Sequence, residues 1–287
     1  MQKDFLKNLL PQFVANLEAK DRSRSTILAY RADIEQFIEY LTEHSVVLAS
    51  DVKREDIEGF RDTLSNKKYT AKSVSRKLNA IKTFFRWLSQ EGLVTSNTSE
   101  NVSHPKVQYM LPKFLSPMEY RALRDVVRDD ERIAAIVELI LQTGLRISEV
   151  SNLKMTDIVN HELTIRAYST QPERKVPLND PAKESFDRYM AIRPETDSPF
   201  IFVSKNGKPL AIRNIRAAID RYMQRAGIER FSVNDLRTTF IVENLKGGVD
   251  LILISQVSGH RRLSTTERYL ELAGATESGK RQTLVEL

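Results

Sequence analysis

Apolar residues recur at helical spacing through most of the first 90 residues and return to that spacing after residue 116. Four early segments show this period with polar residues on the opposite face. The spacing predicts helices over residues 6–20, 23–43, 54–66 and about 71–90. Short connections join these segments, so they are expected to pack as a small helical bundle.

The helical period is lost over residues 91–117, which hold three prolines among clustered Ser, Thr and Asn residues. This composition is typical of an extended connection between domains. We therefore predict a first domain over residues 1–105, a linker over residues 106–115 and a second domain over residues 116–287. A chain of 287 residues is long enough for each of two domains to bury its own core.

The second domain mixes helical and alternating patterns. Helical spacing predicts helices over residues 116–129, 131–143 and 146–158, with a capping box at Ser116 and Glu119 and a stop at Gly144. Alternation rich in β-branched residues predicts a hairpin from residues 162–168 and 174–179, and a third short strand around residues 199–204. The pattern is helical from residue 182 onward, so the predicted fold class is mainly α with a small β-sheet.

Composition excludes several kinds of chemistry. The chain has no cysteine, and its four histidines are not spaced to share a metal ion, so we expect no metal site, no thiol nucleophile and no cofactor. A nucleophile would have to be a hydroxyl, an amine or a carboxylate. The longest apolar run is too short to cross a bilayer and the N-terminus lacks a signal sequence, so we expect a cytoplasmic protein without a membrane partner.

Positive charge is concentrated in one predicted helix. The net charge is +6, and residues 67–86 hold seven basic residues and no acidic one. Five of these residues fall on one side of a helix, namely Lys68, Lys72, Arg76, Lys82 and Arg86. The face is either an ordinary solvated surface or a surface that binds the phosphates of a nucleic acid, and the lack of nearby acids favours the second interpretation.

The order of four residues in the second domain indicates a function that none of them indicates alone. Taken singly, Arg146 could pair with Glu149, and Arg237, His260 and Tyr269 could be structural. Together they suit phosphoryl transfer. Two arginines can bind a phosphodiester bidentately, a histidine can donate or accept a proton, and a tyrosine hydroxyl can attack phosphorus to form a phosphotyrosine.

The segments TGLRISEVSNL, LRTTF and GHRRLSTTERY, together with the hairpin that ends in VPL, resemble the successive boxes of the tyrosine recombinase (phage integrase) family. The likeness is strongest to Xer-type site-specific recombinases, and it extends over essentially the whole chain. It implies an N-terminal helical core-binding domain of the SAM-like kind and a C-terminal mixed α/β catalytic domain. In this family the two domains close around DNA as a clamp.

The resemblance also implies roles for the residues in these boxes. Arg146 and Arg237 would hold the scissile phosphate, His260 would hydrogen-bond to it, and Tyr269 would attack to leave a 3′-phosphotyrosine. Glu149 would orient its neighbours. The implied partner is double-stranded DNA at a specific recombination site, on the nucleoid. A homo-tetramer, or a hetero-tetramer with a related recombinase, would exchange strands through a Holliday junction without metal or ATP.

Two positions depart from the family pattern. Asn234 stands where the family commonly has histidine, and the usual catalytic lysine would fall near Ser169. Lys175 is the nearest substitute and is a tentative general acid. Three functions therefore stay open: a slow but active recombinase, a catalytically impaired relative that binds a DNA site as an accessory factor, and a topoisomerase IB-like nicking and resealing enzyme.

The chain ends in an apolar cluster that follows Tyr269 in the sequence, formed by Leu284, Val285 and Leu287. The family resemblance implies that such a tail docks on a neighbouring protomer.

Overall fold

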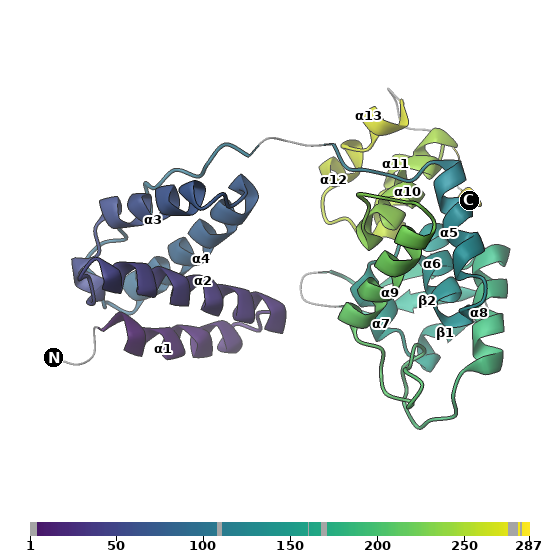
Figure 1. Ribbon diagram of the computed structural model, residues 1–287, viewed down its shortest axis with the longest axis horizontal. Coiled ribbons are helices and arrows are strands. Elements are labelled where there is room, and N and C mark those ends of the chain that lie inside the picture. The colour runs from purple at the N-terminus through teal and green to yellow at the C-terminus, as the bar shows by residue number, and fades with distance from the viewer. Residues whose placement is uncertain (1–4, 108–110, 160, 168–170, 275–280, 282) are drawn as a thin grey trace. The chain divides into compact units, whose positions relative to one another are not determined.

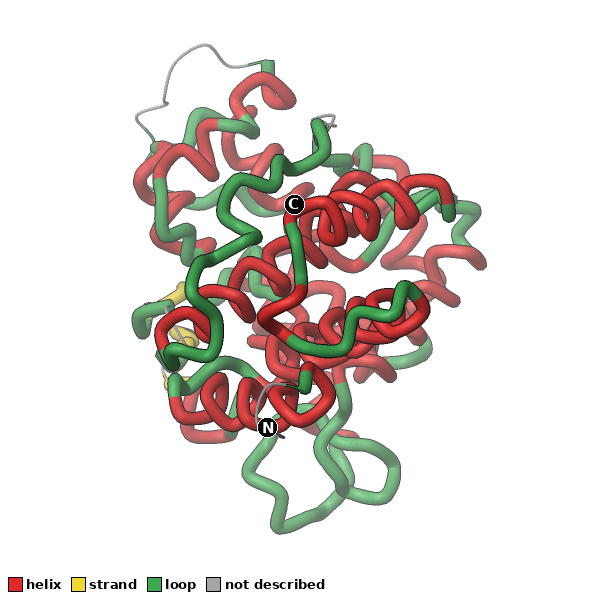
Figure 2. The backbone as a smooth tube through the Cα atoms, turned by 90° about the vertical axis from the view of Figure 1, so that its left-hand side faces the viewer, coloured by secondary structure: helices red, strands yellow, loops and turns green. Residues whose placement is uncertain are grey.

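The computed structural model describes residues 5–107, 111–159, 161–167, 171–274, 281 and 283–287. The chain forms two compact units, an N-terminal unit over residues 1–110 and a C-terminal unit over residues 111–287. Both units are mainly helical, and strands make up a small part of the chain (Figure 2). The predicted fold class is confirmed.

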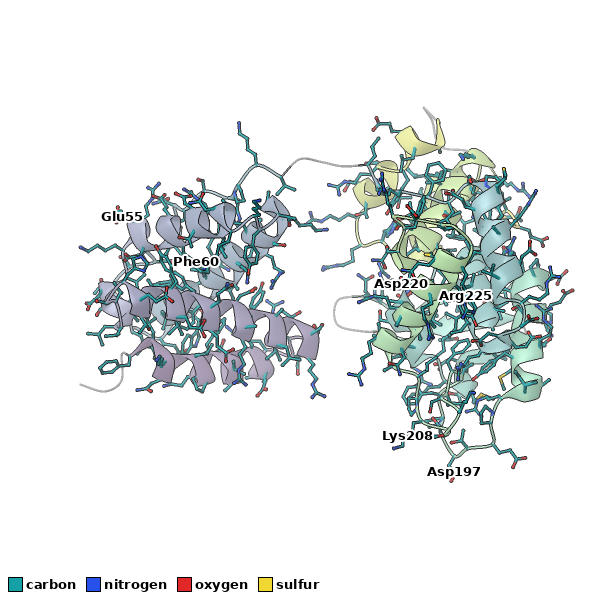
Figure 3. The ribbon with its side chains drawn as sticks, in the orientation of Figure 1. Glu55, Phe60, Asp197, Lys208, Asp220 and Arg225 are labelled. Atoms are coloured by element: carbon teal, nitrogen blue, oxygen red, sulfur yellow. The ribbon has the colours of Figure 1, made fainter. Side chains whose placement is uncertain are left out.

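The N-terminal unit is a bundle of the four predicted helices (Figure 1). These are α1 (Leu6–Ala19), α2 (Arg24–Glu43), α3 (Arg54–Asn66) and α4 (Ala71–Gln90), with a short 3₁₀ turn at Ala49–Asp51. Helix α2 contacts each of the other three, and their apolar faces meet in one core. On α3, Phe60 points into this core while Glu55 points into solvent (Figure 3).

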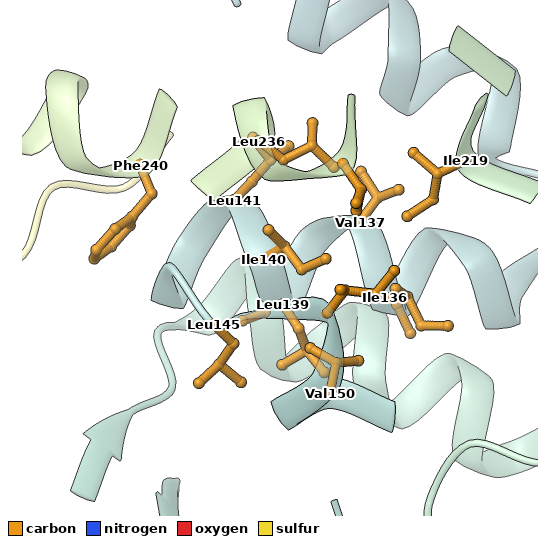
Figure 4. Close-up of a cluster of buried hydrophobic side chains, with 14 of the residues drawn as sticks. Ile136, Val137, Leu139, Ile140, Leu141, Leu145, Val150, Ile219, Leu236 and Phe240 are labelled. Carbon is orange, nitrogen blue, oxygen red and sulfur yellow. The ribbon is translucent and has the colours of Figure 1, made fainter. Parts of the chain in front are cut away.

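The C-terminal unit is built around helix α6, which is buried over residues 133–143 because five other helices cover it. A helix that is apolar all round belongs at the centre of a fold. Figure 4 shows Ile136, Ile140 and Leu141 of α6 among apolar side chains from its neighbours, including Phe240. The helices of this unit are α5 (Pro117–Val127), α6 (Glu131–Thr143), α7 (Ile147–Asn152), α8 (Asp180–Ile192), α9 (Ile212–Arg225), α10 (Val233–Lys246), α11 (Leu251–Ser258), α12 (Leu263–Glu267) and α13 (Leu270–Ala273).

A three-stranded antiparallel sheet lies in the C-terminal unit in the order β1-β2-β3. Its strands are β1 (Ile158–Val159), β2 (Glu162–Ile165) and β3 (Arg174–Pro177). In the β2–β3 hairpin, Leu163 pairs with Val176 and Ile165 pairs with Arg174. Because side chains alternate along a strand, Arg174 and Val176 face the interior of the unit while Lys175 faces solvent.

Two predicted elements differ in the structure. The third strand is Ile158–Val159, and residues 199–204 make only isolated bridges through Phe200 and Val203. Within that segment the carbonyls of Phe200 and Ile201 accept hydrogen bonds from the Arg193 guanidinium. Those of Pro199 and Phe202 accept the backbone N–H groups of Met155 and Leu210, so the segment bonds to separate parts of the chain and not to one neighbouring strand. The helix predicted over residues 146–158 ends at Asn152, and a 3₁₀ turn follows at Met155–Asp157.

The apolar cluster at the end of the chain packs against its own C-terminal unit. The backbone N–H of Val285 donates to Asn244 Oδ1 at 2.8 Å, and the N–H of Leu287 donates to Gln142 Oε1 at 3.2 Å. Docking on a neighbouring protomer would require these contacts to open. Among the described residues, no helix combines the length and apolar content that crossing a membrane requires.

Candidate active site

Arg146 lies at the turn between α6 and α7. Gly144 ends α6 in the left-handed conformation (φ 64°), and Arg146 then caps the N-terminus of α7. Glu149 completes a capping box, because its carboxylate accepts the backbone N–H of Arg146 at 2.8 Å and Arg146 Nη1 at 2.9 Å. The Arg146 side chain is held in this way with 32% of its surface still exposed.

A second arginine, Arg174 at the start of β3, binds the same carboxylate. Arg174 Nη1 donates to Glu149 Oε1 at 3.0 Å and Nη2 donates to Oε2 at 2.8 Å. Burial by itself raises the pKa of Glu149, but the hydrogen bonds and charges of Arg174 and Arg146 outweigh it and bring the pKa below its ordinary value. Glu149 is therefore ionised at neutral pH and joins two arginines.

Arg237 reaches the same place from the first turns of α10. Its Nη1 donates to the carbonyl of Gly144, and its Nη2 donates to the carbonyl of Ser258 at 2.6 Å. Burial, followed by the positive charge of Arg146, lowers the pKa of Arg237 to about 9. The guanidinium is still protonated at neutral pH, although burial and the positive charge of Arg146 both disfavour the protonated form.

These arginines meet at the carboxyl end of α11, whose last carbonyls have no partner within the helix. Ser258 O accepts Arg146 Nη1 at 3.4 Å as well as Arg237, and Gly259 O accepts Arg146 Nη2 at 2.9 Å. Gly259 then turns the chain in the left-handed conformation (φ 63°), so that His260 follows directly beside the arginines.

His260 is held as a neutral imidazole. Burial, and then the charges of Arg237, Arg146 and Arg174, lower its pKa to about 3. Its Nδ1 is 2.8 Å from the buried hydroxyl of Thr266, which fixes the ring plane and leaves Nε2 as the nitrogen available to a substrate. A neutral imidazole can donate or accept a hydrogen bond there, depending on its tautomer.

Tyr269 lies between α12 and α13. Its ring is parallel to that of His260, with the centroids 6.2 Å apart and the planes at 5°. The structure thus brings together Arg146, Glu149, Arg237, His260 and Tyr269, which come from four separate parts of the chain. A pocket beside His260 and Arg174 opens this cluster to solvent.

Two other candidate positions, Lys175 and Asn234, are exposed. Lys175 faces away from the cluster, since its Nζ pairs with Glu162 at 2.7 Å and its side chain is 69% exposed. The hydrogen bond to Glu162 also raises the pKa of Lys175, which makes the ammonium a weaker acid. Asn234 is exposed one helical turn before Arg237 and on the same face of α10. Ser169 lies outside the described residues.

Arg174 was not selected from the sequence, although the strand pattern contained a signal for it. In the sequence Arg-Lys-Val-Pro, the buried position of Val176 puts Arg174 on the interior face and Lys175 on the outer face. A basic residue on the interior face of a strand needs an acidic or carbonyl partner. That partner, Glu149, is 25 residues away in the sequence and becomes visible in the folded chain.

The basic face of α4 is paired with an acidic residue of another helix, although residues 67–86 contain no acidic residue. Lys72, Arg76 and Arg86 are exposed and Lys82 is partly exposed, whereas Lys68 precedes the helix. Buried Asp33 of α2 pairs with Arg76 and, at 2.8 Å, with the buried ammonium of Lys77. The charge of α4 is therefore partly compensated across the bundle.

A second basic surface was missed. Helix α9 exposes four arginines along one side, and this helix is strongly amphipathic. They are Arg213, Arg216, Arg221 and Arg225. Their spacing at every three to five residues is the signal that could have identified the surface.

Known proteins match both units. Residues 113–275 match the phage integrase family, and residues 10–92 match the phage integrase N-terminal SAM-like domain. Tyrosine recombinase XerC of Staphylococcus saprophyticus is 32% identical over 261 residues, 87% of each chain. XerC of Herpetosiphon aurantiacus is 28% identical over 281 residues, 93% of this chain and 92% of the relative.

The fold also matches a crystal structure of a lambda integrase tetramer bound to a Holliday junction. The TM-score is 0.74 at 18% identity, over 90% of this chain and 78% of the integrase chain. The family match covers more than half of the chain and includes the residues grouped at the end of α11, namely Arg146, Glu149, Arg174, Arg237, His260 and Tyr269. The chain therefore belongs to the phage integrase family, the tyrosine-type site-specific recombinases.

Proposed function

We propose that this protein cuts and rejoins DNA at a specific site, with Tyr269 as the nucleophile. The observation that carries the proposal is the grouping of Tyr269 and His260 with Arg146 and Arg237 at the end of α11. The tyrosine oxygen attacks phosphorus and the bond to the 5′-oxygen breaks, which leaves a 3′-phosphotyrosine and a free 5′-hydroxyl. Attack by a 5′-hydroxyl of another strand reverses the step, so the energy of the phosphodiester is kept.

The arginines supply the electrostatic part of this reaction. Arg146 and Arg237 are anchored by carbonyls and by Glu149, so they need little reorganisation to bind the phosphate oxygens. Neutral His260 offers Nε2 as a hydrogen-bond donor or proton acceptor beside the nucleophile. Glu149 acts through Arg146 and is a positioning residue.

Protonation of the leaving 5′-oxygen is the step for which the candidate residues are least suited. Asn234 cannot exchange a proton near neutral pH, and Lys175 points away from the cluster. Loss of one general acid or base costs about 10²–10⁴ in rate, so we expect slow cleavage. This departure also favours a second candidate function, a site-specific DNA-binding factor that no longer cuts.

The bound DNA would be double-stranded, held through the exposed basic residues of α4 and of α9. The matched lambda integrase forms a tetramer on a Holliday junction. We propose the same assembly for this chain, either with itself or with a related recombinase. The domain arrangement that we propose is a core-binding unit, a linker near residues 106–115 and a catalytic unit. A chromosomal or plasmid site would place the protein on the nucleoid in the cytoplasm.

The test begins with selection of the bound site from a random duplex pool. A nicked suicide duplex with that site should then form a covalent protein–DNA adduct with the wild type and none with Tyr269→Phe. Lys183→Ala is the control, since a lysine on α8 that pairs with Asp187 lies outside the cluster and should leave cleavage unchanged. A site that is bound without any adduct supports the DNA-binding factor instead. Relaxation of supercoils without recombinant product supports a topoisomerase-like enzyme.

A further inference from the structure

Arg174 is mostly buried at the site, and its guanidinium binds acceptors on two different elements. Two of its nitrogens bind the two oxygens of Glu149 on α7, and Nε donates to the carbonyl of Val257 on α11 at 2.8 Å. Its side chain is 10% exposed. Arg174 therefore joins the β2–β3 hairpin to both elements on which the arginine cluster is built.

Glu149 depends on this contact for its orientation. Oε1 accepts Arg146 Nη1 and Arg174 Nη1, while Oε2 accepts the backbone N–H of Arg146 and Arg174 Nη2. The carboxylate thus has four donors, two from each arginine. Without Arg174, half of them are lost and the carboxylate remains mostly buried.

Gly259 shows how tightly the arginine is packed against the end of α11. A Cβ at Gly259 would lie 2.9 Å from Cζ and Nη1 of Arg174. The carbonyls of Val257, Ser258 and Gly259 are each bound by an arginine, and His260 follows immediately. A change in Arg174 is therefore transmitted to the turn that places His260.

We propose that Arg174 is a positioning residue of the recombination reaction, which holds Glu149 and the carboxyl end of α11 so that Arg146 and His260 keep their places. Three of its five N–H groups bind Glu149 and the carbonyl of Val257, so the role that we assign to Arg174 is to hold these partners. The catalytic part of this proposal rests on the proposed function. The structural part, which is the dependence of Glu149 on Arg174 for its orientation, does not rest on the proposed function.

The proposal distinguishes arginine from lysine at this position. A lysine keeps the charge, but its single ammonium cannot span two carboxylate oxygens and a carbonyl with the same geometry. A methionine removes both charge and hydrogen bonds at similar length. The charged groups that face Glu149 are Arg146 at the start of α7, Arg174 on β3 and Arg237 on α10. With Arg174 gone, burial dominates and raises the pKa of Glu149.

Activity provides the first readout. Adduct formation on the suicide duplex should fall about 10²-fold in Arg174→Met, because small misplacements of catalytic groups have effects of that size. The loss should deepen as pH falls from 8 to 6, as Glu149 takes up a proton. Arg174→Lys should recover part of the rate. Arg188→Met, which removes an exposed arginine of α8 that pairs with Glu131, should match the wild type at every pH.

Thermal unfolding without DNA provides the second readout. A raised pKa of Glu149 stabilises the folded variant as pH falls, so the Tm gap between wild type and Arg174→Met should narrow from pH 8 to pH 5. A constant gap, or a wild-type rate and pH profile in Arg174→Met, overturns the proposal. If Arg174→Met does not fold, Arg174→Lys decides by the same two measurements. A narrowing gap with no wild-type adduct supports the positioning role and rejects the recombinase activity.

Discussion

Asp33 lies buried between two cations of α4, and Asp33→Asn removes its charge at nearly constant volume. The Asp33 side chain is 2% exposed and that of Lys77 is 9% exposed, whereas Arg76 is 48% exposed. Arg76 can move into water when its partner loses its charge. Lys77 has no such route, because its ammonium is enclosed by the bundle.

The expected loss follows from this difference. Removing one partner of a buried ion pair costs about 3–5 kcal/mol, because an uncompensated charge stays in the interior. Arg76 is half-exposed, and its removal leaves Asp33 paired with Lys77, so Arg76→Gln should cost about 1 kcal/mol or less and is the matched control. With an m-value of about 2 kcal/mol/M in urea, Asp33→Asn should lower the midpoint of the N-terminal unit by about 2 M. Arg76→Gln should lower it by less than about 0.5 M.

Trp87 makes the measurement specific to this unit. It is the single tryptophan of the chain, is 5% exposed and stacks on Phe84 in the N-terminal core. Urea titration followed by its fluorescence therefore reports unfolding of the N-terminal bundle. The reasoning would be refuted by an Asp33→Asn midpoint equal to that of Arg76→Gln. The double variant Asp33→Leu/Lys77→Met should recover most of the loss, since it removes both buried charges.

Two further predictions concern the C-terminal unit. In the DNA-free protein, His260 should stay neutral from pH 8 to about pH 5, because its lowered pKa of about 3 places protonation below that range. An NMR titration with His260→Asn to assign the signal checks this, and a midpoint near the ordinary histidine pKa would contradict it. Gly144→Ala should cost about 2–4 kcal/mol, since its Cβ would lie 2.3 Å from the Phe240 ring at a φ of +64°. Gly227 is the control, because it has a similar φ of +69° and a Cβ there would have nothing within 4 Å. Gly227→Ala should therefore cost about 1–2 kcal/mol, measured for both variants by thermal unfolding. Equal losses in the two variants would show that the Phe240 ring moves aside for the Cβ at residue 144.

Most of the helices could be predicted from the sequence because the signal is local. An apolar period of 3.6 residues marked the four helices of the N-terminal bundle, and the capping box at Ser116 and Glu119 marked the start of α5. The short elements could not be predicted in the same way. Residues 199–204 look like a strand, but their backbone groups bond to separate segments of the chain and to the Arg193 side chain, which the sequence does not indicate.

The candidate site could be predicted as a set of residues but not as an arrangement. The order of Arg146, Arg237, His260 and Tyr269 is visible in the chain. The carbonyl of Ser258 accepts hydrogen bonds from two of these arginines, and this contact exists only in the folded chain. Pairs such as Asp33 with Lys77, which are 44 residues apart, likewise depend on packing that no local pattern describes.

The arginine cluster has a consequence for the stability of the unit that contains it. Arg146, Arg174 and Arg237 surround one carboxylate, Glu149, so two positive charges in this group of four side chains are uncompensated. Their repulsion and burial are large enough to lower the pKa of Arg237 to about 9. This excess of positive charge opposes folding of the C-terminal unit, and a bound anion would offset it. Part of the affinity of the C-terminal unit for a phosphodiester is then relief of a destabilisation that the free protein carries.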